Sequence, residues 1–66
     1  MNKEFLKFIQ LIGSQVNASE FLGVTEGMVS RMKTGDRQVS VKHADKISKK
    51  YPEISFSGLL LYRKAA

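Results

Sequence analysis

Three glycines, Gly13, Gly23 and Gly35, divide the first half of the chain into short segments, and this spacing limits any helix there to about two or three turns. Ser14 follows the first glycine directly, and Thr25 follows the second after one residue. Glycine ends helices because it adopts the left-handed conformation, and serine or threonine caps the helix that follows. The sequence therefore predicts three short helices in succession, with tight turns between them.

The apolar periodicity agrees with these boundaries. In the first segment, apolar residues recur three and four positions apart, the pattern of a helix with one core-facing side: Phe5, Phe8, Ile9 and Ile12. This helix spans Asn2 to Ile12, with Asn2 as its N-cap. The second helix runs from Gln15 to Leu22. In the third, Val29 and Met32 lie three positions apart and face the core.

The polar segment from Thr34 to Val39 predicts a loop after the third helix. Ser40 can cap a fourth helix that ends before Pro52, because the residue before a proline is disfavoured in the helical conformation. The predicted buried side of this helix is Val41, Ala44, Ile47 and Tyr51.

A fifth short helix is predicted at the end of the sequence. Either Ser55 or Ser57 can cap it, and it continues to Tyr62 and frays toward Ala66. No stretch alternates with a period of two, so no strand is predicted. With 42% apolar residues in 66, the chain is expected to form one domain over residues 1–66, an all-α fold of five short helices around a single core.

Composition argues against several classes of site. Zero cysteines exclude disulfides and thiolate metal sites, and the single histidine, His43, cannot assemble an imidazole site by itself. His43 and Asp45 face different ways on a helix, so we expect no enzyme, no metal, no other cofactor and no small-molecule substrate. The chain has no apolar run of about 18 residues, and charged residues interrupt the apolar ones at its N-terminus. We therefore expect a cytoplasmic protein without membrane contacts.

Positive charge is concentrated in one segment of the chain. The net charge is +5, and the segment from Arg31 to Lys50 accounts for all of it, with seven basic residues against Asp36 and Asp45. The remainder of the chain is neutral. A basic segment of this kind favours a polyanionic partner.

The stretch SQVNASEFLGVTEGMVSRM has the form of a helix-turn-helix, in which two helices flank a short glycine-containing turn and the second helix enters the major groove of DNA. In residue order and spacing it resembles the lambda-repressor-like helix-turn-helix family, which includes phage repressors and Cro proteins. The resemblance is carried by Gln15, Ala18, Leu22, Gly23, Val24, Val29 and Met32. The segment from Lys33 to Leu60 is similar to the family's loop, fourth helix and fifth helix. Two departures are Ser19, where the family usually has alanine, and Gly27, which interrupts the recognition helix.

The resemblance implies a compact five-helix lambda-repressor-like fold and a Cro-like transcription regulator, a phage or prophage repressor that occupies operator DNA. The family's base-facing positions correspond to Glu26, Gly27 and Arg31. Met28 and Ser30, which are outward positions on the same helix, are also expected to contact bases. Arg31 can donate two hydrogen bonds to guanine, and Glu26 can accept one from cytosine or adenine. Met28 can touch a thymine methyl group or cover the edge of the core.

Phosphate contacts are expected around the base-facing helix. The family's glutamine that opens the second helix contacts phosphate, and helix starts and basic side chains supply further donors. The expected phosphate contacts are Ser14, Gln15, Thr25, Lys33, Arg37, Gln38 and Lys42. Lys46, Lys49 and Lys50 are expected to form a solvated helix face instead.

Members of this family usually bind palindromic operators as two-fold dimers, so the resemblance implies double-stranded DNA as the partner and a homodimer as the active form. The apolar run from Leu59 to Tyr62 can supply a dimer surface, or it can pack on the first helix. Two other functions are compatible with the same residues. One is an antitoxin or plasmid regulator of the same fold, and the other is a degenerate helix-turn-helix that binds proteins.

Overall fold

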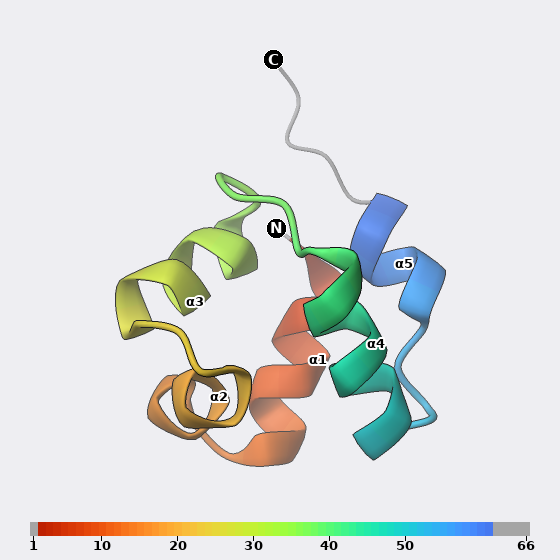
Figure 1. Ribbon diagram of the computed structural model, residues 1–66, viewed down its shortest axis with the longest axis horizontal. Coiled ribbons are helices and arrows are strands. Elements are labelled where there is room, and N and C mark those ends of the chain that lie inside the picture. Colours follow the sequence, from red (N-terminus) through yellow and green to blue (C-terminus); the bar gives the residue numbers. More distant parts are fainter. Residues whose placement is uncertain (1, 62–66) are drawn as a thin grey trace.

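The computed structural model describes residues 2–61 and contains five helices in that range (Figure 1). They are α1 (Lys3–Ile12), α2 (Gln15–Leu22), α3 (Glu26–Thr34), α4 (Val41–Lys50) and α5 (Phe56–Leu61). No strand occurs in the described range. The predicted all-α fold of five helices is therefore confirmed, although the predicted end of the last helix, at Tyr62 and beyond, lies outside the described residues. None of these helices is both long enough and apolar enough to span a membrane.

Side-chain caps fix where the helices begin. In each of the first four helices, the cap oxygen accepts a hydrogen bond from the backbone N–H three residues further on, at 3.1 to 3.2 Å. These caps are Asn2, Ser14, Thr25 and Ser40, as predicted. At the fifth helix the structure selects Ser55 over Ser57, because the Gly58 N–H donates to the Ser55 hydroxyl at 2.9 Å.

The helix ends follow two different rules. Gly23 ends α2 with φ 71° and ψ 33°, and Gly35 ends α3 with φ 93°, both in the left-handed region that favours glycine. Helix α4 has no glycine at its end. Its last residue, Lys50, is followed by Tyr51 at φ −125° and ψ 86°, outside the helical region, directly before Pro52.

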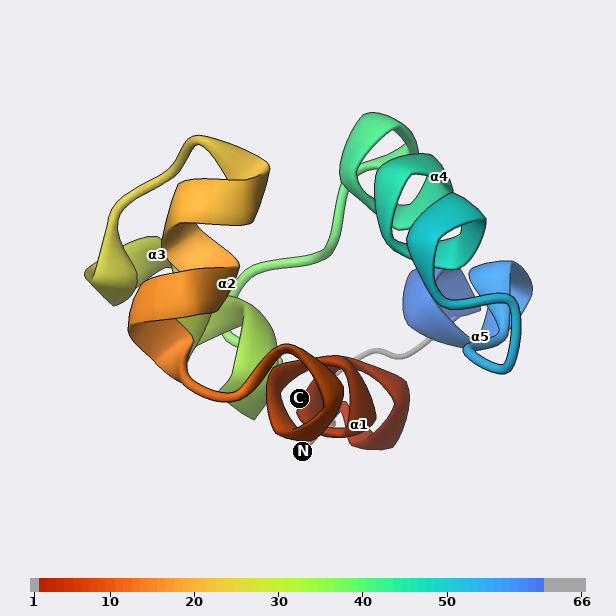
Figure 2. The same cartoon turned by 90° about the horizontal axis from the view of Figure 1, so that it is seen from below.

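The helices form two pairs joined through α1. Helix α2 packs most closely on α3, and α4 packs on α5, whereas α1 contacts α2, α3 and α5. Figure 2 shows the α2–α3 pair and the α4–α5 pair on opposite sides, with the α3–α4 loop crossing between them. Asn2 joins the start of α1 to both pairs, because its backbone N–H donates to the Lys33 carbonyl at 2.9 Å and its side chain donates to the Leu59 carbonyl at 3.3 Å.

A single hydrophobic core fills the space among the five helices. Its buried members come from every helix and from two connecting segments: Phe5, Phe8, Ala18, Leu22, Val29, Met32, Val39, Ala44, Ile47, Ile54 and Leu59. Tyr51 is half-buried against this core, as predicted.

The prediction for Val41 was wrong. Its side chain is 63% exposed, and Val39 in the preceding loop is buried instead. Ser40 is extended, with φ −73° and ψ 158°, so the chain passes the core at Val39 before the first helical turn begins. Helical periodicity cannot report this, because the inward residue lies outside the helix.

Candidate nucleic-acid interface

The turn between α2 and α3 consists of three residues and is held by backbone hydrogen bonds. The N–H groups of Gly23 and Val24 both donate to the Ser19 carbonyl, at 2.8 and 3.0 Å. Val24 is half-buried against the core. Ala18 and Ser19 are buried on α2, and the Ser19 hydroxyl donates to the Val16 carbonyl at 2.7 Å. Serine therefore fits this buried position, because its hydroxyl has a partner within its own helix.

Helix α3 has one buried face and one exposed face. Val29 and Met32 are buried, as the spacing predicted. Glu26, Gly27 and Arg31 are all exposed, so the three predicted base-facing residues share the outer face of the helix. Glu26 lies in the first turn, where a carboxylate interacts favourably with the positive end of the helix dipole.

The remaining candidates on α3 lie at the boundary between its two faces. Met28 is half-buried and packs against the core cluster, which confirms the alternative that it covers the core edge. Ser30 and Lys33 are also half-buried. The exposed surface of α3 is thus narrower than the full set of outward positions predicted from the sequence.

Two helix N-termini present the other predicted phosphate contacts. Ser14 and Gln15 are half-buried at the start of α2, and Thr25 is exposed at the start of α3. The Ser14 and Thr25 hydroxyls each accept a backbone hydrogen bond as a cap, and each still has its own proton to donate. An N-terminus of this kind attracts anions through its free backbone N–H groups.

The α3–α4 loop, residues 35–40, is fixed at several points. The Thr34 hydroxyl donates to the Asp36 carboxylate at 2.8 Å, and the Arg37 backbone N–H donates to the Arg31 carbonyl at 3.1 Å. The Gln38 side-chain nitrogen donates to the Leu60 carbonyl at 2.8 Å. Sequence reasoning expected Gln38 to contact phosphate and missed this bond, which holds its amide against α5. The exposed side chain of Arg37 therefore extends from a loop that these hydrogen bonds hold in place.

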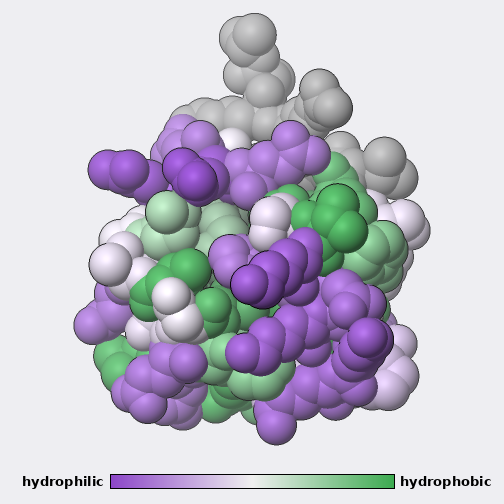
Figure 3. Space-filling model, viewed as in Figure 1, coloured by the Kyte–Doolittle hydropathy of each residue, from purple (hydrophilic) through white to green (hydrophobic). Residues whose placement is uncertain are grey.

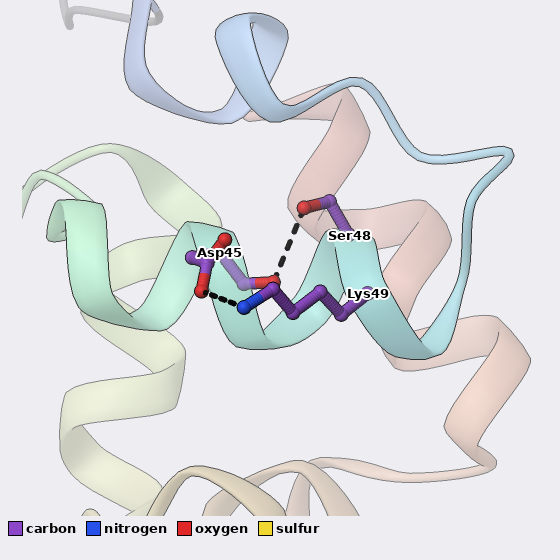
Figure 4. A network of polar contacts seen from close by, with 3 residues as sticks. All are labelled: Asp45, Ser48 and Lys49. Atoms are coloured by element: carbon purple, nitrogen blue, oxygen red, sulfur yellow. Dashed lines mark hydrogen bonds and ion pairs between the residues drawn. The ribbon is translucent and has the colours of Figure 1, made fainter.

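The basic residues of α4 differ in their surroundings. Lys42 is exposed in the first turn. The Lys49 ammonium pairs with the Asp45 carboxylate at 3.0 Å, and the Ser48 hydroxyl donates to the Asp45 carbonyl at 3.2 Å (Figure 4). Lys46 and Lys50 were expected to be solvated. Both are exposed, yet both ammonium groups also lie over the Phe21 ring of α2. Nothing in the sequence signals these contacts, which join residues 25 and 29 positions apart.

His43 lies half-buried in the first turn of α4. Burial lowers its pKa below the ordinary value of 6.5, and the positive charges of Lys42, Lys46 and Arg37 lower it further.

Polar surface covers the α3–α4 loop and the later part of the exposed side of α4, with a hydrophobic patch beside the start of α4, as Figure 3 shows on one face of the molecule. Comparisons of the chain with protein-family models, with curated proteins and with solved structures found no match.

Proposed function

We propose that the protein is a sequence-specific DNA-binding regulator of the lambda-repressor-like, Cro-like type, with α2 and α3 as its helix-turn-helix. The observation that carries the proposal is the exposed face of α3, on which Glu26, Gly27 and Arg31 lie together. The segment from Arg31 to Lys50, which covers the second half of α3, the loop and α4, supplies all of the net positive charge. An exposed polar helix face followed by the exposed cations Arg37 and Lys42 matches the two needs of DNA recognition, base-edge contacts and phosphate contacts.

In this proposal, α3 lies in the major groove. Arg31 donates to the O6 and N7 atoms of guanine, and Glu26 accepts from a cytosine or adenine amino group. Arg37 and Lys42 bind phosphates beside the groove, and the capped N-termini of α2 and α3 hold the backbone in register. The regulator acts in the cytoplasm by occupying operator DNA and blocking polymerase.

The proposal includes a two-fold dimer on a palindromic operator, with recognition helices about 34 Å apart. It is supported by apolar side chains on the α4–α5 side of the molecule, where Val41 is 63% exposed and Phe56 is also exposed. Sedimentation at high protein concentration tests this part of the proposal, and a monomer there would refute it.

The decisive experiment is the selection of bound duplexes from a random DNA library at near-physiological salt, where non-specific binding is suppressed. Enrichment of a palindrome with a guanine in each half-site is the expected result. Absence of any enriched sequence, with binding lost as salt rises, would contradict the proposal.

Replacing Arg31 tests the role of a single residue. Arg31→Ala should weaken binding to the selected duplex by about 1 to 3 kcal/mol and relax discrimination at one base pair. Lys33→Ala is the matched control, since it removes one charge from the same helix and should weaken binding evenly across sequences. Equal effects of both variants on all duplexes would remove Arg31 from base recognition.

A further inference from the structure

Helix α4 carries phosphate-binding groups of the proposed interface, but it does not pack closely on α2 or α3. The α2–α3 pair and the α4–α5 pair lie on opposite sides of the molecule (Figure 2). They are joined by α1 and by the α3–α4 loop. A DNA-binding surface built from α3 and the start of α4 needs a fixed distance between the two pairs, since phosphate and base contacts must be made at the same time. Any side-chain contact that joins α2 directly to α4 would therefore help to keep this distance fixed.

Lysine side chains make this link. The Lys46 ammonium donates a hydrogen bond to the Phe21 carbonyl at 2.5 Å and lies 4.8 Å from the centroid of the Phe21 ring. Phe21 lies in the last turn of α2, where backbone carbonyls have no partner within the helix. The N–H groups of Gly23 and Val24 both bind the Ser19 carbonyl, so the Phe21 carbonyl depends on a side chain from elsewhere. Lys46 thus caps the C-terminus of α2, where a positive charge is favourable.

Lys50 strengthens the same contact and connects it to the core. Its ammonium lies 5.6 Å from the centroids of both the Phe21 and Tyr51 rings. The centroid of the Phe21 ring in turn lies 5.8 Å from the centroid of the Phe8 ring, and the Phe8 and Tyr51 ring centroids are 6.0 Å apart. The Phe21 side chain is therefore held between the core and two lysines of α4, and a displacement of α4 relative to α2 would break contacts on both sides of the ring.

These contacts give the basic residues of α4 different roles. Lys42 is exposed in the first turn of α4, whereas the Lys46 ammonium is bonded to a carbonyl of α2. A lysine that binds a backbone carbonyl has fewer donors for phosphate and holds two helices in one arrangement. We propose that Lys46, assisted by Lys50, is a positioning residue that fixes α4 relative to the α2–α3 pair. This role rests on the proposed DNA-binding function.

The test compares four single variants on the selected duplex at several salt concentrations, each variant being shown by circular dichroism to be folded at the assay temperature. Lys46→Met keeps most of the aliphatic stem but removes the donor and the charge, and Lys46→Arg keeps both. Lys49→Met is the matched control, because it removes one positive charge from the same helix at a side chain paired with Asp45. Lys42→Met removes a predicted phosphate contact.

A positioning role and a phosphate contact differ in salt dependence. We expect Lys46→Met to weaken specific binding about fivefold without changing the slope of log K against log salt, and Lys46→Arg to restore it. Lys42→Met should reduce the magnitude of that slope by about 0.9. A reduced slope for Lys46→Met would show that Lys46 is a phosphate ligand. An affinity for Lys46→Met no lower than that of Lys49→Met would also overturn the positioning role.

NMR of the free protein separates this proposal from the DNA-binding proposal. The Lys46 ε-methylene protons should be shifted upfield by the Phe21 ring, and Phe21→Leu should remove the shift while Lys49 protons stay unchanged. Unshifted Lys46 protons in the unmodified protein would show that the contact is absent, whatever the DNA result. A shifted resonance in a protein that binds no duplex would reject the DNA-binding function and, with it, the role in positioning.

Discussion

Two exposed glycines near the α2–α3 turn should respond in opposite directions to the same substitution. Gly23 and Gly27 are both solvent-exposed, and the Cβ of an alanine would meet no atom within 4 Å at Gly23 and only the Thr25 hydroxyl, at 3.9 Å, at Gly27. Side-chain crowding is thus absent at both sites. They differ in backbone conformation, because Gly23 is left-handed with φ 71° and Gly27 is in the first turn of α3 without a positive φ.

The magnitudes follow from this difference. At Gly27, alanine should raise the free energy of unfolding by about 0.5 to 1 kcal/mol, since it fixes fewer backbone degrees of freedom on folding. At Gly23, the left-handed conformation costs alanine about 1 to 2 kcal/mol, partly offset by about 0.4 to 1 kcal/mol from the restricted unfolded chain. The two variants should therefore differ by about 1.5 kcal/mol, within a range of about 0.5 to 2.6 kcal/mol, and the central value corresponds to about 10 °C in Tm for a domain of this size.

Thermal and urea unfolding followed by circular dichroism measure both variants under the same conditions. The expected order of stability is Gly27→Ala, unmodified protein, Gly23→Ala. Equal or greater stability for Gly23→Ala would refute the assignment of the left-handed turn. A loss of stability in Gly27→Ala would show that α3 does not adopt a regular first turn at that residue.

Three further predictions concern other parts of the molecule. Asn2→Ala should lower the free energy of unfolding by about 2 kcal/mol, because it removes the α1 cap and the side-chain donor to the Leu59 carbonyl. Urea unfolding checks this, with Asn2→Asp, which keeps the cap oxygen, as the comparison variant. Val39→Ala should destabilise the protein by about 1 to 2.5 kcal/mol, whereas Val41→Ala should change stability by no more than about 0.5 kcal/mol, and a reversed order in denaturant unfolding would contradict the burial seen here. Because the folded pKa of His43 is lowered, the contribution of this residue to stability should be complete above the ordinary value of 6.5 and should decline as the pH falls below it toward the folded pKa. His43→Gln should remove this part of the pH dependence in unfolding experiments between pH 8 and pH 5, and an unchanged profile would argue against it.

Much of the secondary structure could be predicted because the signals are local. A cap and the N–H that it binds are three residues apart, and a glycine that ends a helix acts through its own backbone. The positions of Asn2, Ser14, Thr25 and Ser40 therefore predicted where the first four helices start. The exposure of Glu26 and Arg31 also followed, since Val29 and Met32 set the buried face of the same helix.

The choice between similar local patterns was made by packing. Val39 and Val41 are both valines beside the same cap, and only the path of the loop past the core decides that the first is buried. Ser55 and Ser57 can both cap a helix, and the structure uses the first. In each case the sequence offers two equivalent residues, and the three-dimensional position of the backbone distinguishes them.

The role of a polar side chain depends even more on tertiary structure. Gln38 and Lys46 are solvent-exposed by composition and periodicity, yet their partners are carbonyls 22 and 25 residues away. Such bonds require helices from distant parts of the chain to approach within hydrogen-bond distance, which is a property of the assembled core and not of either segment. By itself the sequence determined the helices, their caps and the basic segment, because these depend on neighbours a few residues apart. The tertiary structure alone decided which lysine points to solvent and which holds two helices together, because that depends on how the helices pack.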